Sequence, residues 1–133
     1  MRALLDTSFF VATESGRPLA ETETITDTET ITETEVSVVT LAELTVGVLM
    51  ADDDARPARV STLSAVESTW DPLPIDAEVA RQFARIVAAL RAGGRRVPIL
   101  DALVAATAIV EQIPIITQDN DYGAIPGVEV IWV

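Results

Sequence analysis

The sequence contains no cysteine, no histidine and no lysine. Without cysteine there is neither a disulfide framework nor a thiolate metal site, and without histidine there is no imidazole ligand or imidazole general base. All nine basic residues are therefore arginines. Any chemistry in this chain must use carboxylates, hydroxyls, arginines or a bound ion.

Long apolar runs are also missing. None approaches the roughly 18 residues that a membrane span needs, and the N-terminus lacks a basic flank followed by a small-residue cleavage site. We therefore expect a soluble, cytoplasmic protein with no membrane partner. The 133 residues are 49% hydrophobic, with a mean hydropathy of +0.34, which is enough for one well-formed core and too little for two. A single domain over residues 1–133 is predicted.

Positive charge is scarce, since 21 acidic residues face nine basic ones and the net charge is −12. This balance argues against capture of nucleic acid by a broad basic surface. The acidic residues are unevenly distributed, because six of them lie between Glu21 and Glu35. Carboxylates that bind divalent cations are also neutralised when the ion is bound.

Short apolar runs bounded by turn residues predict buried strands, and amphipathic stretches between them predict helices. Their alternation indicates an α/β fold with a central, mainly parallel sheet flanked by helices. Expected helix ends are a capping box formed by Thr40 and Glu43, Pro98 in a first helical position, and a stop at Gly93-Gly94. The predicted strands are 3–5, 36–39, 73–75, 113–116 and 128–132, and the predicted helices are 40–50, 55–68, 76–91 and 98–111.

A six-residue unit, Thr-Glu-Thr-Ile-Thr-Asp, is followed by a near copy, Thr-Glu-Thr-Ile-Thr-Glu, within residues 22–33. Its only apolar residues are Ile25 and Ile31. Such a polar, acidic composition cannot bury enough apolar surface to order itself. We expect a solvated acidic loop or lid at about residues 19–35.

Four acidic residues each have a sufficient local explanation. Asp6 can cap the segment that follows it, and Glu43 can complete the capping box. Asp101 can complement a helix dipole, and Asp119 can form an Asx-turn. Taken singly, none of them indicates a functional site.

Taken together, these four carboxylates follow the carboxyl ends of predicted strands or lie early in the next helix. In an open parallel sheet such positions converge on one edge, where α/β folds bind ligands. Clustered carboxylates repel one another unless a cation lies among them. An all-oxygen site favours Mg²⁺ or Mn²⁺, and phosphodiester hydrolysis is the natural chemistry of such ions.

At these residues the sequence resembles the PIN-domain family, and particularly the VapC-type toxins. The matching pieces occur in the family's order and span nearly the whole chain: Leu4-Leu5-Asp6-Thr7-Ser8, the segment 36–44, the segment 100–108, and the segment 115–122. The resemblance implies a three-layer PIN-like fold and an acidic quartet of Asp6, Glu43, Asp101 and Asp119 that binds Mg²⁺ or Mn²⁺. It leaves Asp121 either as a fifth ligand or as a structural residue, and Ser8 and Thr117 either as hydroxyls that orient the carboxylates or as simple cap and turn residues.

The same resemblance implies a metal-dependent endoribonuclease that acts as the toxin of a toxin–antitoxin pair. Its partners would be an RNA substrate, a cognate VapB-type antitoxin and a second copy in a homodimer. The Thr/Glu repeat departs from the family pattern, because it stands where a short helical connection is expected after the first strand. Substrate access, rather than the metal site, is the property that this departure affects.

Arg95 and Arg96 follow Gly93-Gly94, just ahead of the helix that carries Asp101. They can be a solvated loop, or they can contact RNA phosphates beside the metal, where bidentate guanidinium contacts fit well.

Three other classes of protein compete with this interpretation. An inactive PIN-fold binding module, acting only through its antitoxin partner, would not need acids at all four positions. A phosphoacceptor receiver domain requires a pocket lysine, which this chain lacks. A carboxylate-based phosphatase usually has two aspartates spaced two residues apart after the first strand, whereas Asp6 is followed by Thr7 and Ser8.

Overall fold

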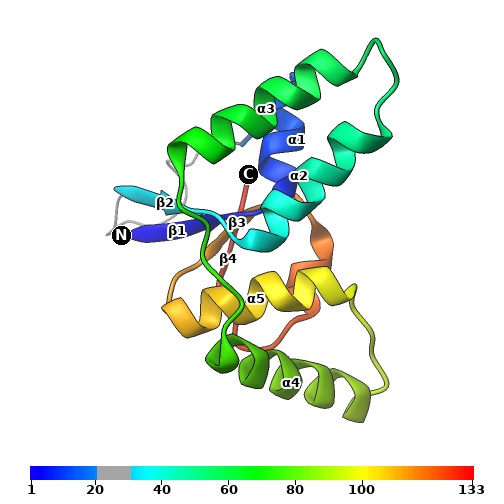
Figure 1. Cartoon of the computed structure of the whole chain (residues 1–133). Helices are drawn as coiled ribbons and strands as arrows, with labels where there is room; N and C mark the ends of the chain where they lie inside the picture. Colours follow the sequence, from blue (N-terminus) through cyan, green and yellow to red (C-terminus); the bar gives the residue numbers. More distant parts are fainter. Residues whose placement is uncertain (21–30) are drawn as a thin grey trace.

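The computed structural model describes residues 1–20 and 31–133 and places four strands in one sheet. All described strand pairs are parallel, and the spatial order is β2-β1-β3-β4. The two central strands are therefore β1 and β3 (Figure 1). The strands are β1 (Arg2–Leu5), β2 (Glu33–Glu35), β3 (Ile115–Thr117) and β4 (Val130–Trp132).

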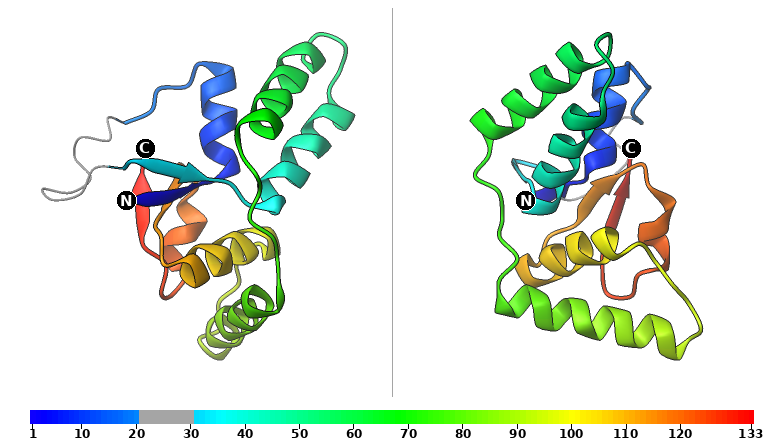
Figure 2. Two further views of the ribbon diagram at one scale, coloured as in Figure 1. Left: turned by 60° about the vertical axis from the view of Figure 1, so that its left-hand side comes forward. Right: turned by 45° about the vertical axis from the view of Figure 1, so that its right-hand side comes forward.

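Helices cover both faces of this sheet. The first three lie on one side and α4 and α5 lie on the other, as all views in Figures 1 and 2 show. The described helices are α1 (Thr7–Ser15), α2 (Val38–Met50), α3 (Arg56–Thr69), α4 (Ala77–Ala92), α5 (Ile99–Glu111) and the short 3₁₀ helix η2 (Asn120–Ala124). The predicted three-layer α/β fold with a parallel sheet is confirmed.

The core is divided by the sheet because side chains alternate along each strand. Ile116 and Ile131 pack with Phe10 and Val66 on the face of α1 and α3. Ile115 packs with residues of α4 and α5 on the other face. In the part of the chain that the structure describes, no helix is both long enough and apolar enough to cross a bilayer.

The predicted strand 36–39 is wrong, because the chain turns into a helix there. Ser37 is the N-cap of α2, and its hydroxyl accepts the backbone N–H of Val39 at 3.0 Å. Thr40 is consequently a buried residue inside α2, and the predicted capping box with Glu43 does not form. Ser37 supplies the acceptor that the first helical turn needs, so the helix begins two residues earlier than expected.

The predicted strand 73–75 is reduced to a single bridge between Leu73 and Ser37. Pro72 and Pro74 flank Leu73 and have no N–H with which to continue a ladder. At the other helix ends the predictions hold more closely. Gly93 caps the end of α4, whereas Pro98 is the residue before α5 rather than its first residue.

The connection after β1 contains a helix that the strand and helix predictions did not include. Asp6 caps the start of α1, and Gly16 ends it with a φ of 70°, a left-handed conformation that favours glycine. Of the expected acidic loop, residues 33–35 instead form β2, which pairs with β1 and is held by an ion pair between Arg2 and Glu35. Residues 21–30 of the repeat lie outside the described residues.

Candidate metal centre

Asp6 is a buried carboxylate at the end of β1, where the chain turns into α1. It accepts hydrogen bonds from the Thr117 hydroxyl at 2.9 Å, from the Tyr122 hydroxyl at 2.9 Å and from the Ser8 backbone N–H at 3.3 Å. Charge-assisted hydrogen bonds of this kind stabilise a buried charge and fix its orientation. Asp6 is thus held in one position by three separate donors.

A directed chain of hydroxyls supports Asp6. The one hydroxyl proton of Thr117 goes to the Asp6 carboxylate, so Ser8 Oγ, which lies 3.0 Å from Thr117 Oγ1, must donate to Thr117. In turn, the backbone N–H of Gln118 donates to Ser8 Oγ and that of Asp119 donates to Thr117 Oγ1, both at 2.9 Å. Both hydroxyls therefore tie the end of β3 to the start of α1.

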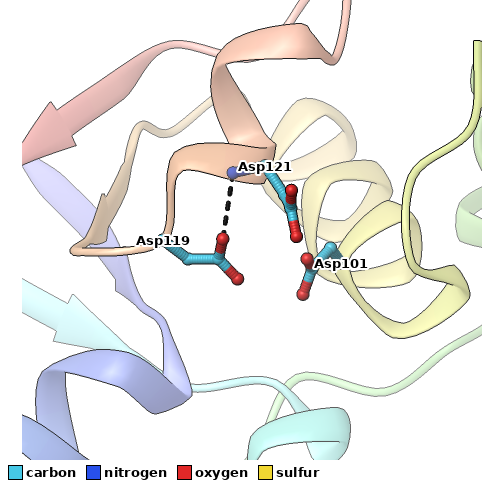
Figure 3. A group of neighbouring side chains, drawn as sticks. All are labelled: Asp101, Asp119 and Asp121. Atoms are coloured by element: carbon cyan, nitrogen blue, oxygen red, sulfur yellow. Dashed lines mark hydrogen bonds between the residues drawn. The ribbon is translucent and has the colours of Figure 1, made fainter.

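Three further carboxylates form a tight cluster in front of this edge. Asp101, Asp119 and Asp121 each offer an oxygen, and these atoms lie within 4.8 Å of one another (Figure 3). Asp101 comes from the first turn of α5, while Asp119 caps η2 and accepts the backbone N–H of Asp121 at 2.9 Å. Asp121, whose role the sequence left open, lies within the cluster.

Glu43 reaches the same region from the middle of α2 but is not one of the three clustered acids. Thr7 donates a hydrogen bond to it at 2.8 Å, which orients the carboxylate. Burial raises the pKa of Glu43, the charges of Asp6 and Asp119 raise it further, and the bond from Thr7 opposes them. Asp6 likewise lies outside the cluster, but its charge contributes to raising the pKa of Asp101, a member of the cluster.

Asp101 carries the clearest sign of crowded negative charge. Burial, together with the negative charges of Asp119 and Asp6, raises its pKa from 3.8 to about 7. Within residues 1–20 and 31–133, no ion pair joins an arginine to any of these five acids. The site thus has an excess of negative charge that no ion pair with a described arginine offsets, an arrangement suited to a bound metal ion.

Two residues of the site were missed by sequence reasoning. Tyr122 is fully buried, and burial together with nearby negative charge raises its pKa, so its hydroxyl stays protonated as a donor to Asp6. It is the only tyrosine of the chain and follows Asp121 directly, which was an available signal, because a buried tyrosine hydroxyl requires a partner. For Thr7, the only signal in the sequence was its position directly after Asp6.

Arg95 and Arg96 both line a groove of about 850 Å³ between the end of α4 and the start of α5. Arg95 alone of the two also lines a second groove, of about 500 Å³, with Gly123 and Ala124 of η2. Because η2 follows Asp119 and includes Asp121, Arg95 borders the segment that carries these two acids. The structure thus distinguishes Arg95 from Arg96 by its position beside η2, a difference that the sequence alone does not show.

Together the topology and the carboxylates define a parallel α/β protein with an all-oxygen candidate cation site at the carboxyl edge of its sheet. Residues 3–128 match the PIN domain family, and the chain belongs to it. The chain is 47% identical to Ribonuclease VapC5 of Mycobacterium tuberculosis over 98% of this chain and 94% of that protein. It is 44% identical to Ribonuclease VapC4 of the same organism over 99% and 97% of the two chains.

The fold is also similar to a solved structure, the crystal structure of a member of the VapBC family of toxin–antitoxin systems, VapBC-5, from Mycobacterium tuberculosis. The TM-score is 0.81 at 39% identity, and the match covers 99% of this chain and 98% of that one. The predicted resemblance to the PIN-domain family and its VapC members is confirmed.

Proposed function

We propose that this protein is an endoribonuclease that hydrolyses RNA phosphodiester bonds with the help of Mg²⁺ or Mn²⁺. The observation that carries the proposal is the group of carboxylates at one sheet edge with no cationic partner among the described residues. The relatives named ribonucleases support the choice of RNA as the substrate.

The residues present fit a hard divalent cation. Asp101, Asp119 and Asp121 can place three oxygens around one ion, and the site contains neither nitrogen nor sulfur ligands. Asp6 and Glu43 complete the acidic set, either by direct ligation or through water. A divalent cation bound there would polarise the scissile phosphate and lower the pKa of a water molecule.

The remaining residues orient this set. Thr117 and Tyr122 hold the two oxygens of Asp6, and Ser8 holds Thr117. Thr7 fixes Glu43. Pre-organised carboxylates need little rearrangement when an ion and a phosphate arrive, which favours catalysis. Of Arg95 and Arg96, Arg95 is the better placed to contact an RNA phosphate, because it borders η2.

The biological role we propose is that of the toxin in a cytoplasmic toxin–antitoxin pair, with a single PIN domain, a cognate VapB-type antitoxin and a homodimeric assembly. The solved relative is described as a member of such a system. The net charge of −12 supports a basic antitoxin segment as partner, because complementary charge accelerates and directs association.

The test is cleavage of a mixed pool of cellular RNAs by the purified full chain, with Mg²⁺, with Mn²⁺ and with chelator. Wild type is compared with Asp101→Asn and with Asp54→Asn, an exposed aspartate between α2 and α3 that serves as a matched control. We expect metal-dependent cleavage by wild type and Asp54→Asn, and none by Asp101→Asn. Full activity of Asp101→Asn would refute the site, and a folded wild type inactive under all conditions would indicate the inactive binding module.

A further inference from the structure

An exposed indole lies on the edge strand β4, opposite a residue that donates a hydrogen bond to Asp6. Trp132 is 46% exposed, whereas its neighbour Ile131 is buried. In the register of β3 and β4, Thr117 lies opposite Trp132, and Ile116 lies opposite Ile131. Because Ile116 and Ile131 face the α1 and α3 side, alternation directs Thr117 and Trp132 to the other side, where η2 lies.

Thr117 is the residue that donates to Asp6, so the indole is one strand away from a hydroxyl of the site. Neighbouring strands are about 4.8 Å apart. The indole thus lies one strand beyond a residue that orients Asp6, although Trp132 and Thr117 are far apart in sequence.

The ring of Trp132 packs on the backbone of η2. A methyl group at Gly123 would lie 3.6 Å from Cζ2 and 3.8 Å from Cη2 of the indole. Gly123 is two residues beyond Asp121, so the same short helix supports the indole and carries an acid of the cluster. These distances are ordinary van der Waals contacts, so the ring lies against η2 while nearly half of the Trp132 surface still faces solvent.

Positive charge for contacts with RNA phosphates is limited in this chain. The chain has nine arginines against 21 acids, and Arg95 is the arginine placed against η2. Proteins that bind single strands obtain much of their affinity from bases stacked on aromatic rings, which needs no positive charge.

We propose that Trp132 is a stacking platform that holds an unpaired nucleobase of the RNA next to the phosphate at the acidic centre. This inference rests on the proposed ribonuclease function and adds a substrate-positioning residue to it. Stacking on Trp132 also requires a single-stranded substrate, because a base within a duplex cannot present its face to the ring.

The experiment compares cleavage kinetics of wild type with those of Trp132→Ala, Trp132→Phe and Leu49→Ala, on one RNA that the wild type cleaves. Leu49 is a matched surface control, since it is 77% exposed near the end of α2. We expect Trp132→Ala to raise KM roughly 5- to 150-fold with little change in kcat, which is the loss of one stacked base. Trp132→Phe should retain most of the affinity, and Leu49→Ala should match wild type.

A second measurement reports stacking directly. The chain has two tryptophans, so Trp70→Phe leaves Trp132 as the only indole, and Trp132→Phe leaves only Trp70, which donates to the Thr34 backbone. With chelator present, a single-stranded RNA of mixed sequence should quench the fluorescence of Trp70→Phe but not that of Trp132→Phe. An abasic ribose-phosphate oligomer should quench neither.

The outcomes separate the two proposals. If wild type cleaves RNA but Trp132→Ala has an unchanged KM, or if the emission of Trp70→Phe is not quenched, the stacking platform is refuted while the nuclease stands. If folded wild type neither cleaves nor binds RNA, the proposed function fails, and the platform fails with it.

Discussion

The substitution Asp101→Asn should stabilise the metal-free protein at the same time as it abolishes cleavage. Asp101 is ionised at neutral pH only against the effects of burial and of the charges on Asp119 and Asp6, which bring its pKa to about 7. Asparagine has nearly the shape of the protonated carboxyl and never ionises. It therefore removes the electrostatic penalty without leaving a cavity.

The size of the effect follows from the pKa. Moving a carboxyl pKa from 3.8 to about 7 would cost roughly 4 kcal/mol in a site sealed from water. Asp101 is only partly buried, so solvent screening reduces this to about 1–2 kcal/mol. For a chain of this length we expect a rise in Tm of about 4–8 °C in the variant.

The contribution of Asp101 to the free energy of unfolding depends on pH. The folded-state pKa of Asp101 is raised, so its contribution is favourable below the unfolded value of 3.8 and is lost as the pH rises through about 7. The advantage of Asp101→Asn should thus be small near pH 4 and complete above about pH 8.

The assay is urea unfolding in chelator at about pH 5 and about pH 8, with Asp54→Asn as a control that should show no such difference between the two pH values. Saturating Mn²⁺ should make wild type more stable than Asp101→Asn. An ion at 100 times its Kd adds about 2.7 kcal/mol to the free energy of unfolding of wild type and little to that of the variant. An Asp101→Asn protein less stable than wild type at about pH 8 in chelator would refute the reasoning.

Three further predictions concern the groups around the site. Tyr122→Phe should lower the free energy of unfolding by about 1.5–3 kcal/mol, measured in urea, because the buried Asp6 loses one of its hydrogen bonds; an effect below about 0.5 kcal/mol would contradict this role. Thr7→Val should raise the pKa of Glu43 and move the acidic limb of the pH–rate profile upward, whereas Thr13→Val in the same helix should leave the profile unchanged. RNA affinity should depend weakly on salt, with a log–log slope of about −0.7 for the one phosphate contact of Arg95, and a much steeper slope would indicate a larger basic surface.

The fold class could be predicted from the sequence because its signals are repeated along the chain. Apolar runs alternate with amphipathic stretches, and Gly93-Gly94 marks the end of α4 as expected. The boundaries around residue 37 could not be predicted in the same way. Val36, Val38 and Val39 favour strands by their β-branched side chains, and only the capping hydroxyl of Ser37, together with burial of Val39, makes this stretch turn into α2.

The candidate site could be predicted as a set of acids but not as an arrangement. The topology brings together Asp101 and Asp119, two of the four acids that the sequence grouped by their positions after strands or early in a helix, and it adds Asp121. Contacts across long separations are not visible in a local pattern. Tyr122 donates to Asp6, which lies 116 positions earlier in the sequence. Trp132 contacts Gly123 because β4 pairs with β3.

The insertion of β3 between β1 and β4 has a consequence for synthesis of the chain. Asp6 is translated before its two hydroxyl donors, Thr117 and Tyr122, which lie 111 and 116 positions further along the chain. Until β3 has emerged and paired with β1, neither the donors nor two of the clustered acids are present. A nascent chain from which β3 and η2 have not yet emerged therefore lacks an assembled centre, so the proposed cleavage of RNA requires translation to have passed Tyr122.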